Sequence, residues 1–398
     1  MHKKTLKDID ISSKRLLIRV DFNVPLHPDG SIADDTRILA CLPTIRYACD
    51  MNCRIILCSH LGRPHGRVVE DLRLGPVARR LSELLGVPVT ALPDTIGPEI
   101  KARTDAMNPG EIILLENLRF YPGEEKNDPV FSSSLAELAD IYVNDAFGAS
   151  HRAHASIVGV AHILPAVAGL LMDKELTMLG NLLEDPKRPF AAVLGGSKVT
   201  GKLQLVEYII TKVNLICIGG GMAATCLTSQ GYTTGNSLVE EDTLDYIGKL
   251  FRKAESLGVT ILVPSDVVIT CGDGMEKQMR SVPVTEIPDG WSIVDIGSNT
   301  LDLFLQQITP CKTIFWNGPM GKFEDSSFAQ GTKTLAEFLA RHPGTTIIGG
   351  GSTAEAVTEL GLANSFSHVS TGGGASLQFL TGTVLPGVEV LWDKDTNG

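Results

Sequence analysis

Short apolar segments alternate with longer segments of helical period along the first half of the chain. The predicted strands cover residues 16–20, 54–58, 112–115 and 141–143. The helices predicted between them cover residues 36–48, 74–85 and 133–138. The predicted strands are nearly continuous apolar runs, which is typical of parallel sheets covered on both faces. This order predicts a βαβ architecture.

The same alternation returns after residue 190. Strands are predicted at 191–194, 215–218, 260–263, 313–316 and 345–348. Helices are predicted at 203–212, 244–257, 333–341 and 353–360. We therefore expect an α/β protein made of two doubly wound, Rossmann-like lobes with parallel sheets.

A helix and a linker are expected between the two halves. Residues 172–183 are rich in helix formers, and Asp185-Pro186-Lys187-Arg188-Pro189 follows them. A chain of 398 residues is also long for a single core. We expect domains at 1–170 and 190–380, an interdomain helix and linker at 171–189, and a separate C-terminal segment at 381–398.

Composition narrows the class of protein. The formal net charge of -11 argues against a general binder of nucleic acid or membrane surfaces. The first residues contain no apolar core of signal-peptide length, and no later stretch is apolar enough to span a bilayer. The eight cysteines form no C-x-x-C pair, which favours reduced thiols over zinc ligation. We expect a cytoplasmic protein.

Arginine and glycine separate along the chain. Of the 17 arginines, 13 precede residue 171, whereas every run of adjacent glycines follows residue 190. Arginine forks bind phosphate or carboxylate through paired hydrogen bonds, and glycine turns let backbone N–H groups approach phosphate. This separation predicts two anionic ligands, one for each half, as in a phosphoryl-transfer enzyme.

Polar side chains follow the predicted strands of the first half. In a parallel sheet these positions share one edge, where ligands bind. Arg37 opens the first predicted helix nearby. Several cations at one edge would hold a small, multiply charged anion. The candidates are Asp21, Asn23, Arg37, His60, Arg63, Arg119 and Arg152.

Glycine turns follow the predicted strands of the second half. The segment Gly195-Gly196-Ser197-Lys198-Val199-Thr200-Gly201-Lys202 resembles a phosphate-binding loop but does not match G-x-x-x-x-G-K-[ST]. On a helix, Lys198 and Lys202 would share a face. The turns Gly219-Gly220-Gly221 and Gly349-Gly350-Gly351 could present helix N-terminal N–H groups to phosphate.

These motifs together resemble the phosphoglycerate kinase family. The resemblance rests on Arg19-Val20-Asp21-Phe22-Asn23-Val24-Pro25, Ser59-His60-Leu61-Gly62-Arg63-Pro64, Glu116-Asn117-Leu118-Arg119-Phe120, Trp316-Asn317-Gly318-Pro319 and Ser370-Thr371-Gly372-Gly373-Gly374. It covers essentially the whole chain in order. It implies reversible transfer of the acyl phosphate of 1,3-bisphosphoglycerate to ADP, which gives ATP and 3-phosphoglycerate.

The resemblance also implies a division of roles. The N-terminal lobe would hold the phosphoglycerate with the seven candidates above, and Arg37 and Lys198 would flank the transferred phosphoryl group. Mg²⁺ would arrive with ADP or ATP. The protein would be a monomer that closes like a hinge, with its C-terminal segment returning to the N-terminal lobe. The residues expected to bind nucleotide are Gly196, Lys198, Lys202, Gly220, Asn317, Pro319, Glu324, Gly350, Gly351, Ser352 and Thr353.

Ser352 departs from the family pattern. An aspartate that helps to place Mg²⁺ usually follows the third glycine of this run, and a serine hydroxyl is a weaker, neutral ligand. Ser352-Thr353-Ala354-Glu355 also fits the S-x-x-E capping box, which predicts Ser352 as a helix cap. Alternatively, Glu355 or a water held by Ser352 restores the metal contact.

Two other functions compete with this one. Ser352 favours a non-catalytic, kinase-like binding protein, but Lys198, Lys202 and the arginines argue against it. A NAD-dependent dehydrogenase would need G-x-G-x-x-G after the first strand of a βαβ unit, and Gly219-Gly220-Gly221 lacks that spacing.

Overall fold

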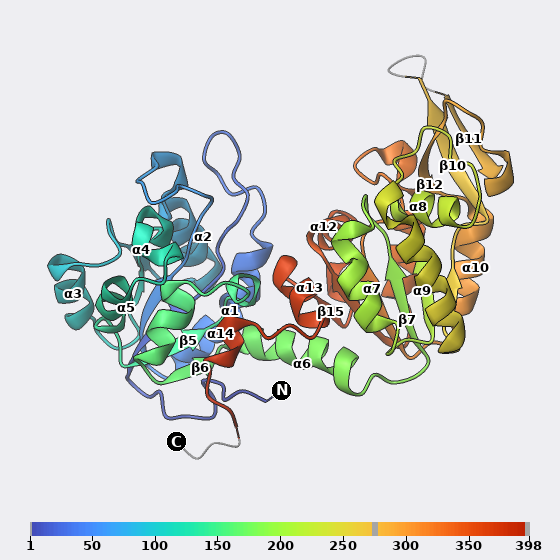
Figure 1. Cartoon of the computed structure of the whole chain (residues 1–398). Helices are drawn as coiled ribbons and strands as arrows, with labels where there is room; N and C mark the ends of the chain where they lie inside the picture. The colour runs from blue at the N-terminus through green and yellow to red at the C-terminus, as the bar shows by residue number, and fades with distance from the viewer. Residues whose placement is uncertain (1, 273–277, 395–398) are drawn as a thin grey trace. The chain divides into compact units, whose positions relative to one another are not determined.

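The computed structural model describes residues 2–272 and 278–394 and divides the chain into two compact units. Unit 1 comprises the described residues within Met1–Thr177 and Val384–Gly398, and unit 2 those within Met178–Thr383. Helix α6 (Leu170–Glu184) begins in unit 1 and ends in unit 2 (Figure 1). Each unit is built on its own six-stranded parallel sheet, which confirms the predicted fold class.

The sheet of unit 1 has the strand order β3-β4-β2-β1-β5-β6, and every neighbouring pair is parallel. Its central strands are buried on both faces because helices cover both. Leu16 and Leu17, which point to opposite faces of β1, are both fully buried. The strands are β1 (Arg15–Arg19), β2 (Arg54–Cys58), β3 (Val89–Ala91), β4 (Ile112–Leu114), β5 (Ile141–Asn144) and β6 (Ala166–Ala168).

The helices of unit 1 follow the strands in the order that the sequence predicts. Asp128 accepts hydrogen bonds from the N–H groups of Val130 and Phe131, which starts α5 four residues before the predicted position. The C-terminal segment packs in this unit through α14, where Asn144 Nδ2 donates to Gly387 O at 2.9 Å. The helices are α1 (Thr36–Asp50), α2 (Gly75–Leu85), α3 (Pro98–Asp105), α4 (Pro122–Glu125), α5 (Pro129–Ala136) and α14 (Pro386–Glu389).

The parallel sheet of unit 2 has the order β15-β14-β13-β7-β8-β9. Trp316 on β13 is fully buried in a core shared with α10 (Ser298–Ile308) and α11 (Gln330–Ala340). The strands are β7 (Phe190–Leu194), β8 (Leu215–Ile218), β9 (Thr260–Leu262), β13 (Thr313–Asn317), β14 (Thr345–Gly349) and β15 (His368–Val369).

Unit 2 also contains an antiparallel sheet that the sequence pattern did not predict. Its order is β11-β10-β12, formed by β10 (Asp266–Cys271), β11 (Gln278–Pro283) and β12 (Ser292–Ile296). β11 is mostly exposed and lacks the alternation of a half-buried strand. The helices of unit 2 are α7 (Leu203–Ile209), α8 (Met222–Ser229), α9 (Leu244–Ser256), α10 (Ser298–Ile308), α11 (Gln330–Ala340), α12 (Gly351–Glu359) and α13 (Gly374–Leu380).

All eight cysteines are free, as expected for reduced thiols. Among the residues that the structure describes, no helix combines the length and apolar character needed to cross a membrane.

Candidate active site

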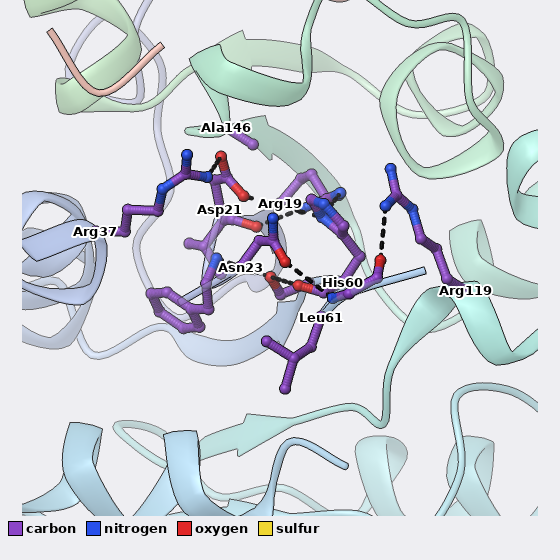
Figure 2. Close-up of polar contacts among 12 residues, drawn as sticks. Arg19, Asp21, Asn23, Arg37, His60, Leu61, Arg119 and Ala146 are labelled. Carbon is purple, nitrogen blue, oxygen red and sulfur yellow. Dashed lines mark hydrogen bonds and ion pairs between the residues drawn. The ribbon is translucent and has the colours of Figure 1, made fainter. Parts of the chain in front are cut away.

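Unit 1 gathers polar residues at one edge of its sheet. Asp21 and Asn23 follow β1, His60 and Arg63 follow β2, and Arg119 lies in the short turn η2 (Leu118–Phe120) after β4. β4, β2, β1 and β5 are adjacent parallel strands, so their carboxyl ends share an edge. The structure therefore brings together most of the predicted phosphoglycerate residues (Figure 2).

Asp21 is the centre of this group. Its Oδ2 accepts a hydrogen bond from Arg37 Nη1 at 2.5 Å, and its Oδ1 lies 3.9 Å from His60 Nδ1. Asp21 Oδ1 is buried and has no hydrogen-bond partner among the described residues. Buried carboxylate oxygens are normally satisfied, so this atom is a ready acceptor for a ligand hydroxyl.

His60 is a neutral group inside a cationic site. Burial, followed by the charges of Arg19 and Arg119, holds the pKa of His60 well below its ordinary value. Its Nδ1 lies 3.0 Å from Nη2 of Arg19. His60 therefore contributes hydrogen bonding rather than charge.

Asn23 and Arg119 meet at Gly62. The N–H of Gly62 donates to Asn23 Oδ1 at 2.9 Å, and Arg119 Nη1 donates to Gly62 O at 2.8 Å. Gly62 has a φ of 62°, and a Cβ there would lie 2.8 Å from the side chain of Leu72. The turn that joins Asn23 to Arg119 thus requires glycine.

Arg119 is a buried cation, and burial lowers its pKa. Glu125 Oε1 lies 3.3 Å from Arg119 Nε, but the geometry is not that of a hydrogen bond. Since a guanidinium stays protonated, Arg119 retains its charge with donors to spare for an anion.

The remaining two candidates lie at the margin of this group. Arg152 Nε is 3.1 Å from His151 Nε2. The positive charge of Arg152 helps to lower the pKa of Arg119. Arg63 is exposed and makes no hydrogen bond or ion pair with any residue that the structure describes. The structure thus does not join Arg63 to the others.

Unit 2 contains a hollow of about 290 Å³ at the carboxyl ends of β7, β13 and β14. Nine of the eleven residues predicted to bind nucleotide line it, which makes it the candidate nucleotide site. Ser197, Gly201, Gly318 and Leu377 also line it and were not predicted. The predicted residues in its wall are Gly196, Lys198, Lys202, Asn317, Pro319, Gly350, Gly351, Ser352 and Thr353.

Three of the loops behind the hollow interlock through glycine. A Cβ on Gly195 would lie 2.2 Å from Pro319 O, and one on Gly318 would lie 2.3 Å from the carbonyl carbon of Gly195. The N–H of Gly220 donates to Met320 O at 2.8 Å, so it is committed to the protein. The first two glycine runs therefore serve close packing of backbone, in addition to any contact with phosphate.

Gly220 and Glu324 do not line the hollow. Gly220 is buried among the loops, and Glu324 is exposed in the segment after β13. Their predicted contacts with nucleotide stay predictions.

Lys202 has an ammonium group, unpaired among the described residues, that could bind phosphate. It is half-buried, burial lowers its pKa, and it makes no hydrogen bond or ion pair with any described residue. A Cβ on Gly196 would lie 3.4 Å from its Nζ, so the ammonium lies over the first glycine turn. The ammonium lacks a counter-charge that a bound phosphate would supply.

Lys198 does not share a helix face with Lys202, contrary to the prediction. Lys202 ends the short turn η6 (Thr200–Lys202), and Lys198 precedes it in irregular backbone. Glu240 fixes this loop, because its carboxylate accepts from the N–H groups of Val199 and Thr200 and from the Thr200 hydroxyl. The hydrogen bonds to Glu240 hold this loop in a conformation other than the helical turn that the spacing of Lys198 and Lys202 predicted.

Helix α12 starts at Gly351, and its cap is Gly350, whose φ is 85°. No side chain caps it, so the predicted capping box of Ser352 and Glu355 is wrong. The positive φ of Gly350 begins the helix two residues early and moves Ser352, which is exposed, into its first turn. The first backbone N–H groups of α12 and the hydroxyl of Ser352 are therefore not used in a side-chain cap.

Asn317 and Thr353 connect β13 to this helix. The N–H of Gly318 donates to Thr353 Oγ1 at 2.6 Å, and Asn317 Nδ2 is a buried donor without a partner among the described residues. A Cβ on Gly350 would lie 3.0 Å from Asn317 Nδ2. The unsatisfied donor lies in the wall of the hollow, where a phosphate oxygen could accept from it.

Four residues support these sites without having been predicted: Arg19, Glu124, Ser156 and Glu240. Arg19 contacts His60, and Glu240 fixes the loop that contains Lys198. Arg19 could have been found from the sequence, because it lies two residues before Asp21 in the first motif. Glu124, Ser156 and Glu240 carry no local signal, since their partners are 32 to 137 residues away.

Two doubly wound units, one with a cationic sheet edge and the other with a glycine- and lysine-lined hollow, define a phosphotransferase. A sequence model of the phosphoglycerate kinase family matches residues 6–383. The chain is 52% identical over 394 residues to the phosphoglycerate kinases of Pelotomaculum thermopropionicum and Moorella thermoacetica, covering 99% of this chain and 100% of each relative. The chain belongs to the phosphoglycerate kinase family.

Solved structures agree with this assignment. The phosphoglycerate kinase of Coxiella burnetii has a TM-score of 0.87 at 38% identity, and that of Pyrococcus horikoshii OT3 has a TM-score of 0.86 at 31% identity. Each comparison covers 98% of both chains. The activity is the reversible transfer of a phosphoryl group from 1,3-bisphosphoglycerate to ADP. In the reverse direction, the carboxyl group of 3-phosphoglycerate accepts the phosphoryl group. A non-catalytic binding protein is not supported.

Proposed function

We propose that the sheet edge of unit 1 holds the phosphoglycerate and that the hollow of unit 2 holds the nucleotide. The observation that carries this proposal is the different design of the two sites. The first offers side-chain guanidinium groups and one unsatisfied carboxylate oxygen, which suit a small phosphorylated hydroxy acid. The second offers a helix N-terminus, glycine turns and a partnerless lysine, which suit a chain of phosphates.

In unit 1, Arg63, Arg119 and Arg152 bind the phosphate and carboxylate oxygens. Asp21 accepts from the hydroxyl of the ligand through Oδ1, Asn23 supports it, and His60 donates to an oxygen. Arg37 is held by Asp21 with part of its guanidinium exposed, so it can also reach the transferred phosphoryl group.

In unit 2, Lys202 and the N–H groups at the start of α12 bind the nucleotide phosphates, and Glu324 accepts from ribose hydroxyls. Lys198 neutralises the equatorial oxygens of the phosphoryl group during in-line transfer, together with Arg37. The acceptor oxygen of ADP is already anionic, so no general base is required. Positioning and electrostatic stabilisation dominate such transfers.

Mg²⁺ is proposed as a companion of the nucleotide. Among the described residues, no three His, Cys, Asp or Glu side chains form a metal site. Ser352 offers one neutral oxygen in the wall of the hollow, which fits an ion that brings its other ligands with it. When bound, Mg²⁺ would neutralise phosphate charge.

We further propose a cytoplasmic monomer in which the two units close like a hinge during transfer. The two bound ligands must come within bonding distance, and closure would exclude the water that hydrolyses acyl phosphates.

The proposed activity and its use of metal are tested by steady-state ATP formation from 1,3-bisphosphoglycerate and ADP during a Mg²⁺ titration. Metal-dependent ATP formation is expected, and formation unaffected by chelation would contradict the metal assignment.

A further inference from the structure

Arg19, the last residue of β1, is one of the largest fully buried side chains in the chain. All three nitrogens of its guanidinium make contacts. Nε donates to Ser156 Oγ at 2.9 Å, Nη1 donates to Val20 O, and Nη2 lies 3.0 Å from His60 Nδ1. Three of the five N–H donors of Arg19 are therefore used within the protein, and its side chain is almost wholly shielded from solvent.

The charge of Arg19 helps to lower the pKa of Glu124, which lies in α4 and is fully buried. Ser156, in the turn η4 (Ala155–Gly159), joins them: its hydroxyl donates to Glu124 Oε1 at 2.7 Å and its N–H donates to Oε2 at 3.0 Å. Burial acts to raise the pKa of Glu124. Contacts with His154, Arg19 and Ser156 outweigh burial and lower it, so Glu124 is an anion.

The contact with Arg19 decides which nitrogen of His60 carries the proton. A guanidinium has donors and no acceptor, so Nδ1 of His60 must offer its lone pair. A neutral imidazole with a lone pair on Nδ1 has its proton on Nε2. No described residue accepts a hydrogen bond from Nε2 of His60, so this donor is available to a ligand.

We propose that Glu124, Ser156 and Arg19 act as positioning residues that fix His60 as the neutral Nε2–H tautomer, and so make it a hydrogen-bond donor to the phosphoglycerate. The proposal rests on the proposed place of His60 in that site. It differs in kind from phosphate binding by arginine, because Arg19 acts through another side chain.

The charged and titratable groups around His60 come from several elements. Arg19 and Asp21 lie on and after β1, Arg37 on α1, Arg119 in η2 and His154 before η4. The cations among them disfavour a protonated imidazole. Asp21 Oδ1 lies 3.9 Å from Nδ1 and cannot donate to it as a carboxylate.

The test is ¹⁵N NMR of the full chain labelled at histidine, with the His60 signal assigned by its absence in His60→Gln. Arg19→Met with Glu124→Gln removes the obligate donor together with the buried anion linked to it through Ser156, which avoids leaving one buried charge alone. Ser156→Ala tests the connection with a smaller change. The matched control is Arg15→Met with Asp140→Asn, which removes an ion pair of 2.7 Å from the other end of β1.

In the unsubstituted protein and the control, His60 should stay neutral with its proton on Nε2 at and above the ordinary histidine pKa of about 6.5. In the Arg19 and Glu124 double variant, the Nδ1–H tautomer should become populated and protonation should move toward the ordinary pKa of about 6.5. Ser156→Ala should give an intermediate spectrum. A protein whose His60 carries the proton on Nδ1, or a double variant whose His60 signals are unchanged, would overturn the proposal.

Kinetics separate this proposal from the placement of His60. The double variant should raise the half-saturating phosphoglycerate concentration by about fivefold, the value of one hydrogen bond, without changing that of ADP. If the spectra change as expected and that concentration does not, the positioning role stands and the place of His60 in the substrate site is wrong.

Discussion

Arg37 Nη1 donates to Asp21 Oδ2 at 2.5 Å, while the other carboxylate oxygen of Asp21 is buried without a hydrogen-bond partner among the described residues. The side chain of Asp21 is 10% exposed and that of Arg37 is 35% exposed. The pair thus presents an acceptor and a partly exposed cation side by side, which is the pattern that a phosphorylated hydroxy acid requires.

Asp21→Asn should weaken phosphoglycerate binding by about tenfold to a hundredfold, since hydrogen bonds with a charged partner contribute about 1.5–3 kcal/mol. The variant loses both the ion pair with Arg37 and the anionic acceptor. Steady-state kinetics with each substrate varied separately measure the effect, and the half-saturating ADP concentration should not change. Asp29→Asn is the control, because Asp29 is exposed and accepts only from Ser31. Equal effects on both substrates would argue against the assignment.

Lys198 and Lys202 should differ in what their removal costs. Lys202→Ala should raise the half-saturating ADP concentration by about tenfold or more, because a desolvated, partnerless ammonium binds phosphate in the ground state. Lys198→Ala should lower turnover by about a hundredfold or more with small changes in substrate affinity, since its contact tightens in the transition state. A loss for Lys198→Ala that is confined to affinity would contradict its role.

Ser352→Asp should lower the half-saturating Mg²⁺ concentration. The substitution places a carboxylate in the first turn of α12, where the helix dipole favours a negative charge and a hard cation finds a better ligand. Ser256→Asp, on the exposed end of α9, is the control. An unchanged Mg²⁺ requirement would show that Ser352 does not face the metal.

Glu240→Ala should lower turnover by about tenfold, less than Lys198→Ala does. The carboxylate of Glu240 holds the N–H groups of Val199 and Thr200, so its loss lets the loop of Lys198 move. Its neighbour Glu241, which is exposed, gives a matched control in Glu241→Ala. If both variants retain full turnover, Lys198 is positioned by other contacts.

Asp145→Asn should change how stability depends on pH. Asp145 is fully buried; its Oδ1 accepts from the N–H groups of Leu171 and Met172 at the start of α6, and its Oδ2 has no partner among the described residues. Burial raises the pKa of Asp145 from 3.8 to about 6, so the folded chain binds its proton more tightly than the unfolded chain. This contribution to stability is present below about pH 4 and is lost as pH rises through about 6.

An asparagine lacks this titration. Between pH 4 and 8 the free energy of unfolding of the variant should therefore rise relative to that of the unsubstituted protein by up to about 3 kcal/mol. Urea unfolding at several pH values measures it. Asp295, whose pKa burial also raises to about 6, should respond with the same sign in Asp295→Asn. A difference that stays constant across this range would rule out a raised pKa for Asp145.

The sequence pattern was sufficient for the buried strands and the residues that follow them. The apolar runs of β1 and β2 mark strands, and the strand ends carry Asp21 and His60 into one edge. It missed β3 and β6, because Val-Thr-Ala and Ala-Val-Ala contain one large apolar residue each, whereas the equally short β4 has the apolar run Ile-Ile-Leu. It missed β11 because an exposed edge strand needs no apolar face.

The residues that hold the site side chains in place were harder to predict from the sequence. Glu124, Ser156 and Glu240 act through contacts that only the folded chain creates. The capping box of Ser352 failed because a sequence motif does not reveal that Gly350 adopts a positive φ and begins α12 earlier. Lys198 and Lys202 have helical spacing, yet the carboxylate of Glu240 holds their loop in a different conformation.

Equilibrium titration of 3-phosphoglycerate and of ADP into Asp21→Asn and Lys202→Ala tests the central claim most directly. The account predicts that Asp21→Asn weakens only 3-phosphoglycerate and that Lys202→Ala weakens only ADP, each by about tenfold or more. The contradicting result is a variant that weakens both ligands equally, or one that weakens only the ligand assigned to the other unit.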